Sequence, residues 1–246
     1  MRWRRGAAVL IVTLAAALPA WGAPLVADLS SHLIAIDSGF TGADVLLYGA
    51  IDEKGDLLIV VRGPEERVVV RRKDRVAGIW MNRDKIEFDD VPAFYAIATN
   101  RPLDEVASPE LLSLYQIGLE SLGVTARDDR PPEEIASFRE ALFRNRIRNG
   151  LYAAEPGKVD FLGERLFRTK IVFPANVPTG TYQAQVFLIR DGAVVSAETT
   201  PLFISKSGFE AEINFFAHTR PALYGLAAIV TALIAGWIAA VVFRKT

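Results

Sequence analysis

Short apolar runs separated by Gly, Asp and Pro dominate the chain from about residue 33 to residue 100. β-branched and aromatic residues in runs of this length are typical of strands. A turn at Lys54-Gly55-Asp56, preceded by Phe40 and Gly42, predicts a hairpin. This part of the chain is therefore predicted to be β, with six runs: HLIAIDS, ADVLLYGAI, DLLIVVRG, RVVVRRKDR, GIWMN and KIEFDD.

Between residues 103 and 150 the apolar spacing becomes that of helices. Asp104 to Leu122 carries apolar residues at helical intervals, and Ser108-Pro109-Glu110 resembles a helix N-cap followed by proline. Pro131 to Asn149 repeats the helical spacing, and Gly150 is a fitting stop. The pattern predicts a helical hairpin over about 103–150.

Strand-like runs return at Leu166 to Phe173 and again from Tyr182, where apolar and polar residues alternate. Asp191-Gly192 is a two-residue hairpin signal. The closing hairpin resembles the last two strands of many immunoglobulin-like sandwiches. We therefore predict a mainly β fold, an immunoglobulin-like β-sandwich built from both ends of residues 24–206, with the α-helical hairpin inserted. Two small β domains flanking the helices are the alternative, because periodicity does not show which strands pair.

The first 23 residues have the order of a secretory signal peptide. Three arginines precede an apolar run of 12 residues from Ala7 to Leu18, and Pro19 and small residues follow it. As a helix this run is about 18 Å long, too short for a hydrocarbon core of roughly 30 Å. Residues 1–23 are therefore predicted to be a signal peptide, with an uncleaved anchor as the alternative.

A second apolar segment, Pro221 to Phe243, has 23 residues and no formal charge. As a helix it spans about 34 Å, which is enough to cross a bilayer. Arg244 and Lys245 follow it, and positive residues stay on the cytoplasmic side. We predict a single-pass protein of the inner (plasma) membrane, with residues 24–206 as a periplasmic domain and 244–246 as a cytoplasmic tail.

The stretch between the β-rich part and the predicted span is itself amphipathic. Ser207 can cap a helix in which Phe209, Ile213 and Phe216 recur on one side. Residues 207–220 are therefore predicted to form a juxtamembrane amphipathic helix. Its apolar stripe is compatible with the lipid interface, with a partner or with packing back on the sandwich.

Composition argues against several classes of function. Without residues 1–22 the chain has 25 Lys and Arg against 29 Asp and Glu, which gives no support to nucleic-acid binding. With no cysteine and only two histidines, 186 positions apart, no metal site or cofactor is predicted. No nucleophile elbow or Gly-rich phosphate loop occurs either. We predict that the protein is not an enzyme; an undetected enzyme would need a deep polar pocket.

One cluster of basic side chains is suited to binding an anion or a partner. Arg71, Arg72, Lys73 and Arg75 follow each other closely, and Trp80 comes soon after. Guanidinium groups match the geometry of oxyanions, so these five residues are candidate contacts for an anion or a partner. A solvated edge strand that uses its charges against aggregation is the alternative.

Several blocks of the chain resemble a known family. The blocks are Phe40-Thr41-Gly42 before ADVLLYGAI, then VVRGPEERVVVRRK, GIWMNRD, DVPAFYAIATNRPL and VPTGTYQAQVFLIRDG. Together with the two apolar ends, they resemble the alphaproteobacterial putative transmembrane protein family over nearly the whole chain. The resemblance implies topology without chemistry. It also implies a link to sulfite-exporter-like permeases, and hence to export of sulfite or an organosulfonate.

These observations lead to two hypotheses of function. The first is a non-enzymatic, membrane-anchored envelope protein that serves as an accessory or interaction subunit of an inner-membrane transporter. Its partners would be the lipid bilayer and a permease, and the many Ala and Gly residues of the span would allow close helix packing. The second is a periplasmic anion-binding module that uses the Arg71 to Arg75 strand. The oligomeric state stays open.

Overall fold

The computed structural model describes residues 24–76, 78–207 and 217–243, which form a mainly β fold with 47% strand and 25% helix. The mainly β prediction is confirmed. The predicted signal peptide (1–23) and tail (244–246) lie outside the described residues, as does most of the predicted juxtamembrane helix (208–216).

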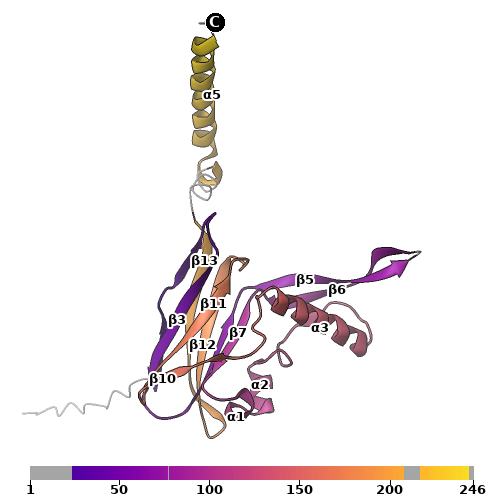
Figure 1. The fold of residues 1–246 in the computed structure, drawn as a ribbon, viewed down its shortest axis with the longest axis vertical. Coiled ribbons are helices and arrows are strands. Elements are labelled where there is room, and N and C mark those ends of the chain that lie inside the picture. Colours follow the sequence, from indigo (N-terminus) through magenta and orange to yellow (C-terminus); the bar gives the residue numbers. More distant parts are fainter. Residues whose placement is uncertain (1–23, 77, 208–216, 244–246) are drawn as a thin grey trace, which may run out of the picture.

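Two β-sheets stand face to face (Figure 1). Each sheet contains strands from before and after the helical region, so the strands form one sandwich rather than two separate β domains. The immunoglobulin-like topology remains a prediction. The strand order of the first sheet is β1 (Leu25–Leu29), β3 (Gly42–Ile51), β11 (Leu166–Pro174) and β10 (Asp160–Leu162). The strand order of the second sheet is β2 (Leu33–Ile36), β13 (Ala193–Lys206), β12 (Gly180–Arg190), β4 (Asp56–Arg62), β7 (Tyr95–Thr99) and β9 (Gly157–Lys158).

Alternation of apolar and polar residues creates the sandwich core. In β11, every second residue is buried, which turns Phe167, Ile171 and Phe173 inward. Tyr182 and Val186 of β12 reach the same cluster from the second sheet. One buried face per strand is the reason that this part of the fold is a two-layer structure.

Strand β4 departs from this alternation because Leu57 to Val61 are all buried. Its second face, with Leu58 and Val60, belongs to another apolar core. That core is covered by α1 (Leu103–Val106), α2 (Pro109–Leu114), α3 (Pro132–Arg148) and the base of a third sheet, β5 (Glu65–Val76), β6 (Ile79–Pro92) and β8 (Thr125–Ala126).

The hairpin predicted at Lys54-Gly55-Asp56 is wrong. The strands on either side of this turn, β3 and β4, lie in different sheets. Because β4 is apolar on both faces, it needs neighbours on both, and the second sheet supplies them between β12 and β7. The Asp191-Gly192 turn is confirmed: both residues have positive φ, 51° and 74°, and they join β12 to β13.

The helical hairpin predicted over about 103–150 is confirmed only in its second half. In place of a continuous helix from Asp104 to Leu122 there are two short helices, α1 and α2. The Ser108 Oγ caps α2 as expected, accepting a hydrogen bond from the Leu111 N–H. The chain then leaves the helix through positive φ at Gln116 and Gly118, which lets Ile117 enter the second core. Helix α3 matches the predicted second helix.

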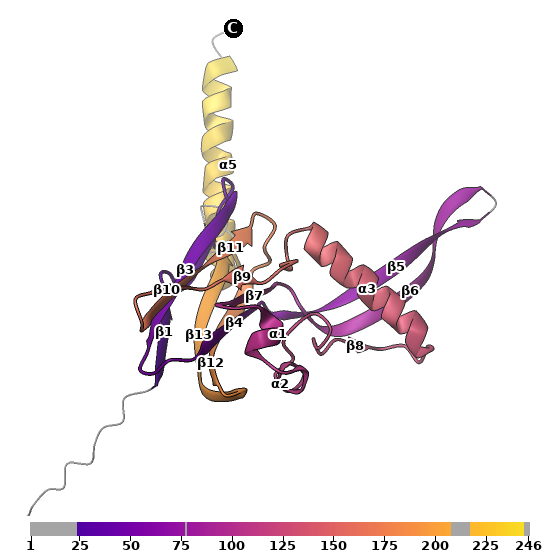
Figure 2. The same ribbon diagram turned by 60° about the horizontal axis from the view of Figure 1, so that its bottom comes forward.

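Strands β5 and β6 leave the sandwich as one long hairpin, here called the arm (residues 65–92), and α3 lies along it (Figures 1 and 2). The C-terminal helix α5 (Pro221–Phe243) has the bounds that the apolar run predicts. Its stretch from Pro221 to Ala240 has a mean hydropathy of 2.0 and is not buried against the rest of the described chain, as expected for a membrane span.

Three buried tyrosines connect the two cores to nearby loops. The Tyr152 hydroxyl donates to the Pro92 carbonyl oxygen at 2.7 Å, and the Tyr182 hydroxyl donates to that of Pro178 at 2.6 Å. The Tyr95 hydroxyl accepts a hydrogen bond from the Gly118 N–H at 2.8 Å. Burial raises the pKa of all three side chains above the ordinary value of 10.0.

The raised tyrosine pKa values predict a loss of stability in alkali. Unfolded tyrosine ionises near pH 10, while the folded chain still holds these protons, so the free energy of unfolding falls as the pH rises above about 10. Denaturant unfolding of the full chain between about pH 8 and pH 11 measures this slope. Tyr152→Phe removes one of the three groups and should flatten the slope. An unchanged slope in this variant would contradict the prediction.

Candidate functional site

The predicted contact residues all lie on the arm. Arg71, Arg72, Lys73 and Arg75 occupy the distal half of β5. Trp80 pairs with Arg75 across the hairpin through its backbone, and its side chain lies outside the described residues. The structure therefore brings the five residues together on one element. That they bind an anion or a partner stays a prediction.

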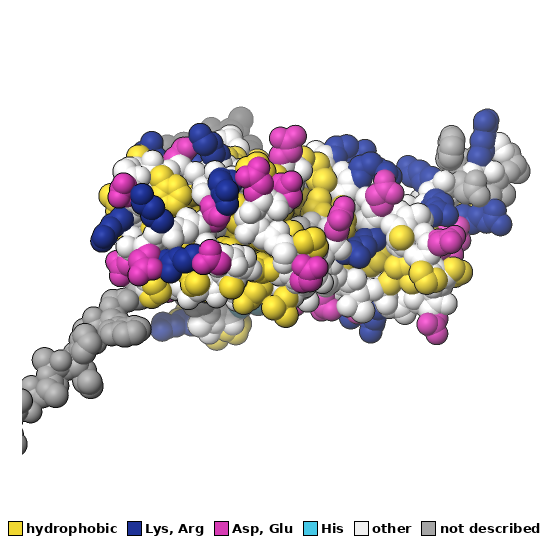
Figure 3. Space-filling model, turned by 90° about the horizontal axis from the view of Figure 1, so that it is seen from below, with side chains coloured by type: hydrophobic (Ala, Val, Ile, Leu, Met, Phe, Trp, Pro, Cys, Tyr) yellow, Lys and Arg dark blue, Asp and Glu magenta, His cyan; other side chains and the backbone are white. Residues whose placement is uncertain are grey.

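The arm concentrates positive charge. From residue 71 to residue 85 it has six Lys or Arg against two Asp, a formal charge of +4 in a chain whose total is −1. Arg71 lies directly opposite Lys85 in the strand pairing. Like charges in this position repel, and Lys85 is offset by an ion pair with Glu87 at 3.3 Å. Lys and Arg side chains gather over this end of the molecule (Figure 3).

Arg72 differs from its neighbours because it holds the arm against α3. Its guanidinium lies 4.4 Å from the centre of the Phe138 ring and donates a hydrogen bond to Ser137 Oγ at 2.7 Å. Val70 and Phe88, on the same side of the hairpin, pack into the second core. Arg72 therefore has a structural role although it is itself exposed, and Arg75 Nε donates to the Gly78 carbonyl oxygen at 3.3 Å. Arg71 and Lys73 are the exposed cations that remain as candidate contacts.

At the base of the arm, charges are paired. Asp89 accepts from Arg67 at 2.7 Å and lies 3.0 Å from Arg127. Arg146 of α3, whose side chain is only 12% exposed, forms an ion pair with Glu66. These contacts fix the arm to the body of the domain.

Arg62, which the sequence places near the basic cluster, is also structural. Its guanidinium is largely buried and donates to Gln185 and to the carbonyl oxygens of Tyr115 and Gln116, at 2.9 and 3.1 Å for the two carbonyls. Burial lowers its pKa. Arg62 therefore ties the loop after α2 to the second sheet.

The end of the arm is apolar. Ile79 and Met81 are 67% and 53% exposed. In the sequence they lie between Arg75 and Arg83. These two large apolar side chains at the end of the hairpin contribute nothing to a core.

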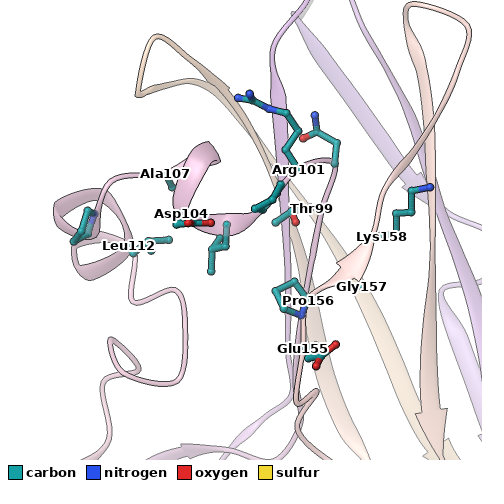
Figure 4. Close-up of a pocket in the computed structure, with 13 residues that line it drawn as sticks. Thr99, Arg101, Asp104, Ala107, Leu112, Glu155, Pro156, Gly157 and Lys158 are labelled. Carbon is teal, nitrogen blue, oxygen red and sulfur yellow. The ribbon is translucent and has the colours of Figure 1, made fainter.

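A cavity of about 800 Å³ lies elsewhere, between the end of β7, the two short helices and β9 (Figure 4). Its charged side chains have both signs, and Arg101, Glu155 and Lys158 point in different directions. Arg101 and Asn100 donate to Asp56; burial raises the pKa of that carboxyl, but the two hydrogen bonds outweigh it and the net shift is downward. The polar groups here serve to join β4 to β7 rather than to converge on a ligand.

The described ranges contain no group of three or more His, Cys, Asp or Glu side chains placed to hold a metal ion. His32 is engaged locally with Asp28, at 2.9 Å. No metal site is therefore assigned within the described ranges.

The outer face of the first sheet carries a second surface that sequence reasoning missed. Val26, Ala50, Leu166 and Leu162 lie side by side in a row across four strands. The side chains of Val26, Leu166 and Leu162 are 58%, 54% and 47% exposed. We call this row the apolar row. The one sequence signal is ADVLLYGAI, where apolar residues occupy both faces of the strand.

A family model described as "Putative transmembrane protein (Alph_Pro_TM)" matches residues 24–245. The match includes the whole domain and α5. No curated protein and no solved structure matches the chain.

Proposed function

We propose that this chain, which belongs to the putative transmembrane protein family whose model covers residues 24–245, is a non-enzymatic, membrane-anchored envelope protein. Its proposed role is that of an accessory or interaction subunit of an inner-membrane transporter. In this proposal α5 is the anchor, residues 24–206 lie in the periplasm and the C-terminus is cytoplasmic. Arg244 and Lys245 support this orientation, since basic residues stay on the cytoplasmic side.

The apolar row is the observation that carries the proposal. It is bordered on one side by a polar row, Asp28, Tyr48, Arg168 and Asp160, and beyond that row Lys170 and Asp44 form an ion pair at 2.7 Å. An apolar centre with a charged border is the usual composition of a protein interface. The surface therefore suits a protein partner better than a small ligand.

The anchor favours a partner in the same membrane. Tethering through α5 confines the domain to the bilayer surface, which raises its effective concentration toward other membrane proteins. The span has small residues, among them Ala228, Ala232, Ala235 and Gly236, that would allow close approach of a second helix. A transporter would supply both a helix for α5 and an extracytoplasmic surface for the apolar row.

Site-specific crosslinking in native membranes tests this proposal. A photoreactive residue at Leu166 should capture one transporter from the membrane, while one at Val195, exposed on β13, should not. Leu162→Asp should lower the Leu166 adduct about tenfold or more, because it places a charge in an apolar contact. Equal adducts from both positions would contradict the proposal.

A periplasmic anion-binding module is the second candidate, favoured by the basic run from Arg71 to Arg75 on β5, of which Arg71 and Lys73 are exposed. Sulfite, an organosulfonate and phosphate are the ligands to titrate against the full chain. Arg71→Glu should abolish binding of whichever anion is bound, and Arg165→Glu, on an exposed turn, should not. Binding that persists in Arg71→Glu would remove this candidate.

A further inference from the structure

We propose that the end of the arm is a second membrane contact, which docks on anionic lipid headgroups with Ile79 and Met81 entering the interface. The inference needs only the membrane anchor, and it stands independently of the transporter and of the soluble anion considered above.

The positive charge of the arm is the first observation that supports a contact with anionic lipid. Residues 71–85 carry a formal charge of +4, and the exposed Arg71 and Lys73 lie on this segment. Anionic lipid surfaces attract such clusters, and their phosphates are the groups that guanidinium forks bind. Lys85 already forms an ion pair with Glu87 at 3.3 Å, so the exposed Arg71 and Lys73 are the cations that a surface of phosphates would meet.

The apolar end is the second support. Ile79 and Met81 are exposed, and in the sequence they lie between Arg75 and Arg83. At a bilayer surface, apolar side chains enter the headgroup region while Lys and Arg bury their stems and leave their charges among the phosphates. A soluble anion would use the charges and leave Ile79 and Met81 in water. A lipid surface would contact both the positive charges and the two apolar side chains.

The arm is also held ready for such a contact. Helix α3 runs along it (Figure 2), and Arg72 stacks on Phe138 near the middle of the hairpin. The ion pair between Arg146 and Glu66 fixes its base. A preformed arm loses little conformational entropy on binding.

The test uses the absence of cysteine in the chain. Met81→Cys in the full-length protein is labelled with an environment-sensitive fluorophore and placed in nanodiscs. One set contains phosphatidylcholine alone, and in the other about a third of the lipid is phosphatidylglycerol. We expect a blue shift and quenching by headgroup-labelled lipid only with the anionic lipid. Inorganic phosphate added to neutral nanodiscs should give no shift, which separates lipid from free anion.

Charge variants complete the test. Arg71→Gln with Lys73→Gln should lower the ratio of inserted to free arms roughly fivefold for each charge removed. The matched control, Lys54→Gln with Arg165→Gln, removes two exposed charges from the turns that join β3 to β4 and β10 to β11, and it should change nothing. Equal spectra in both lipids, equal effects of the two double variants, or shielding of the probe only in the presence of another membrane protein would each overturn the proposal.

Discussion

Gly49→Ala is expected to destabilise the whole domain, by about 3 kcal/mol or more, because it overpacks a position where the backbone cannot move. A β-carbon at Gly49 would lie 2.3 Å from the carbonyl oxygen of Val26 and 2.5 Å from the ring of Phe167. Gly49 pairs with β1 on one side and with β11 on the other, so a shift would break ladders in both directions. Denaturant unfolding of the full chain in detergent, followed by circular dichroism, measures the loss.

Gly39→Ala is the matched control. The nearest atom to its new β-carbon would be Asp37 Oδ1 at 3.5 Å, an ordinary contact. Its unfolding free energy should stay within about 0.5 kcal/mol of the parent. If Gly49→Ala were as stable as Gly39→Ala, the packing of Phe167 over β3 would be wrong.

Phe138→Ala is expected to cost about 3 to 5 kcal/mol, because it leaves a cavity where a large side chain was buried. Phe138 is 2% exposed in the second core, and Arg72 stacks on its outer side. Its loss should also loosen the arm, so amide exchange should rise in β5 and β6 near Val70 and Phe88. Unfolding and hydrogen exchange measured on the same sample test both effects.

Leu114→Ala controls for the loss of a large apolar side chain elsewhere in the helical region. Leu114 is 76% exposed, so the change should be nearly neutral. Faster exchange in the arm of this variant as well would mean that the effect of Phe138→Ala is not specific to α3.

The features that local sequence predicted well depend on near neighbours alone. The Asp191-Gly192 turn needs two residues that accept positive φ, and both occur together. Helix α5 begins and ends where the uncharged run does. Its length and composition are determined by the thickness and apolar interior of the bilayer, and not by contacts with the rest of the chain.

The features that sequence predicted poorly depend on contacts between distant segments. The Lys54-Gly55-Asp56 turn has good local chemistry, yet β4 pairs with β12, more than a hundred positions away. The helix predicted from Asp104 to Leu122 gives way because Ile117 and Leu122 are buried by the second core. Neither the pairing of β4 with β12 nor the burial of Ile117 and Leu122 in the second core is visible in the local periodicity.

Of the candidate site, the sequence shows the basic run but not the contacts that its residues make. The run from Arg71 to Arg75 is visible as a cluster, and the structure places it on one strand. The opposite cation Lys85 and the stacking of Arg72 on Phe138 become visible only when β5, β6 and α3 are together. The sequence therefore identified the segment. The fold shows that Arg72 has a structural role, while Arg71 and Lys73 remain as exposed candidate contacts.

Strand β13 leads out of the domain toward the anchor, so any mechanical load between the membrane and a bound partner passes through it. It is hydrogen-bonded to β12 along its length and to β2 in parallel at its C-terminal end, and the Ser207 N–H donates to the Ile36 carbonyl oxygen at 2.8 Å. These bonds run across the strand, so a pull along it strains them in shear and many must break together. A pull on the C-terminal end of β13 is therefore expected to load many hydrogen bonds at once rather than one pair after another.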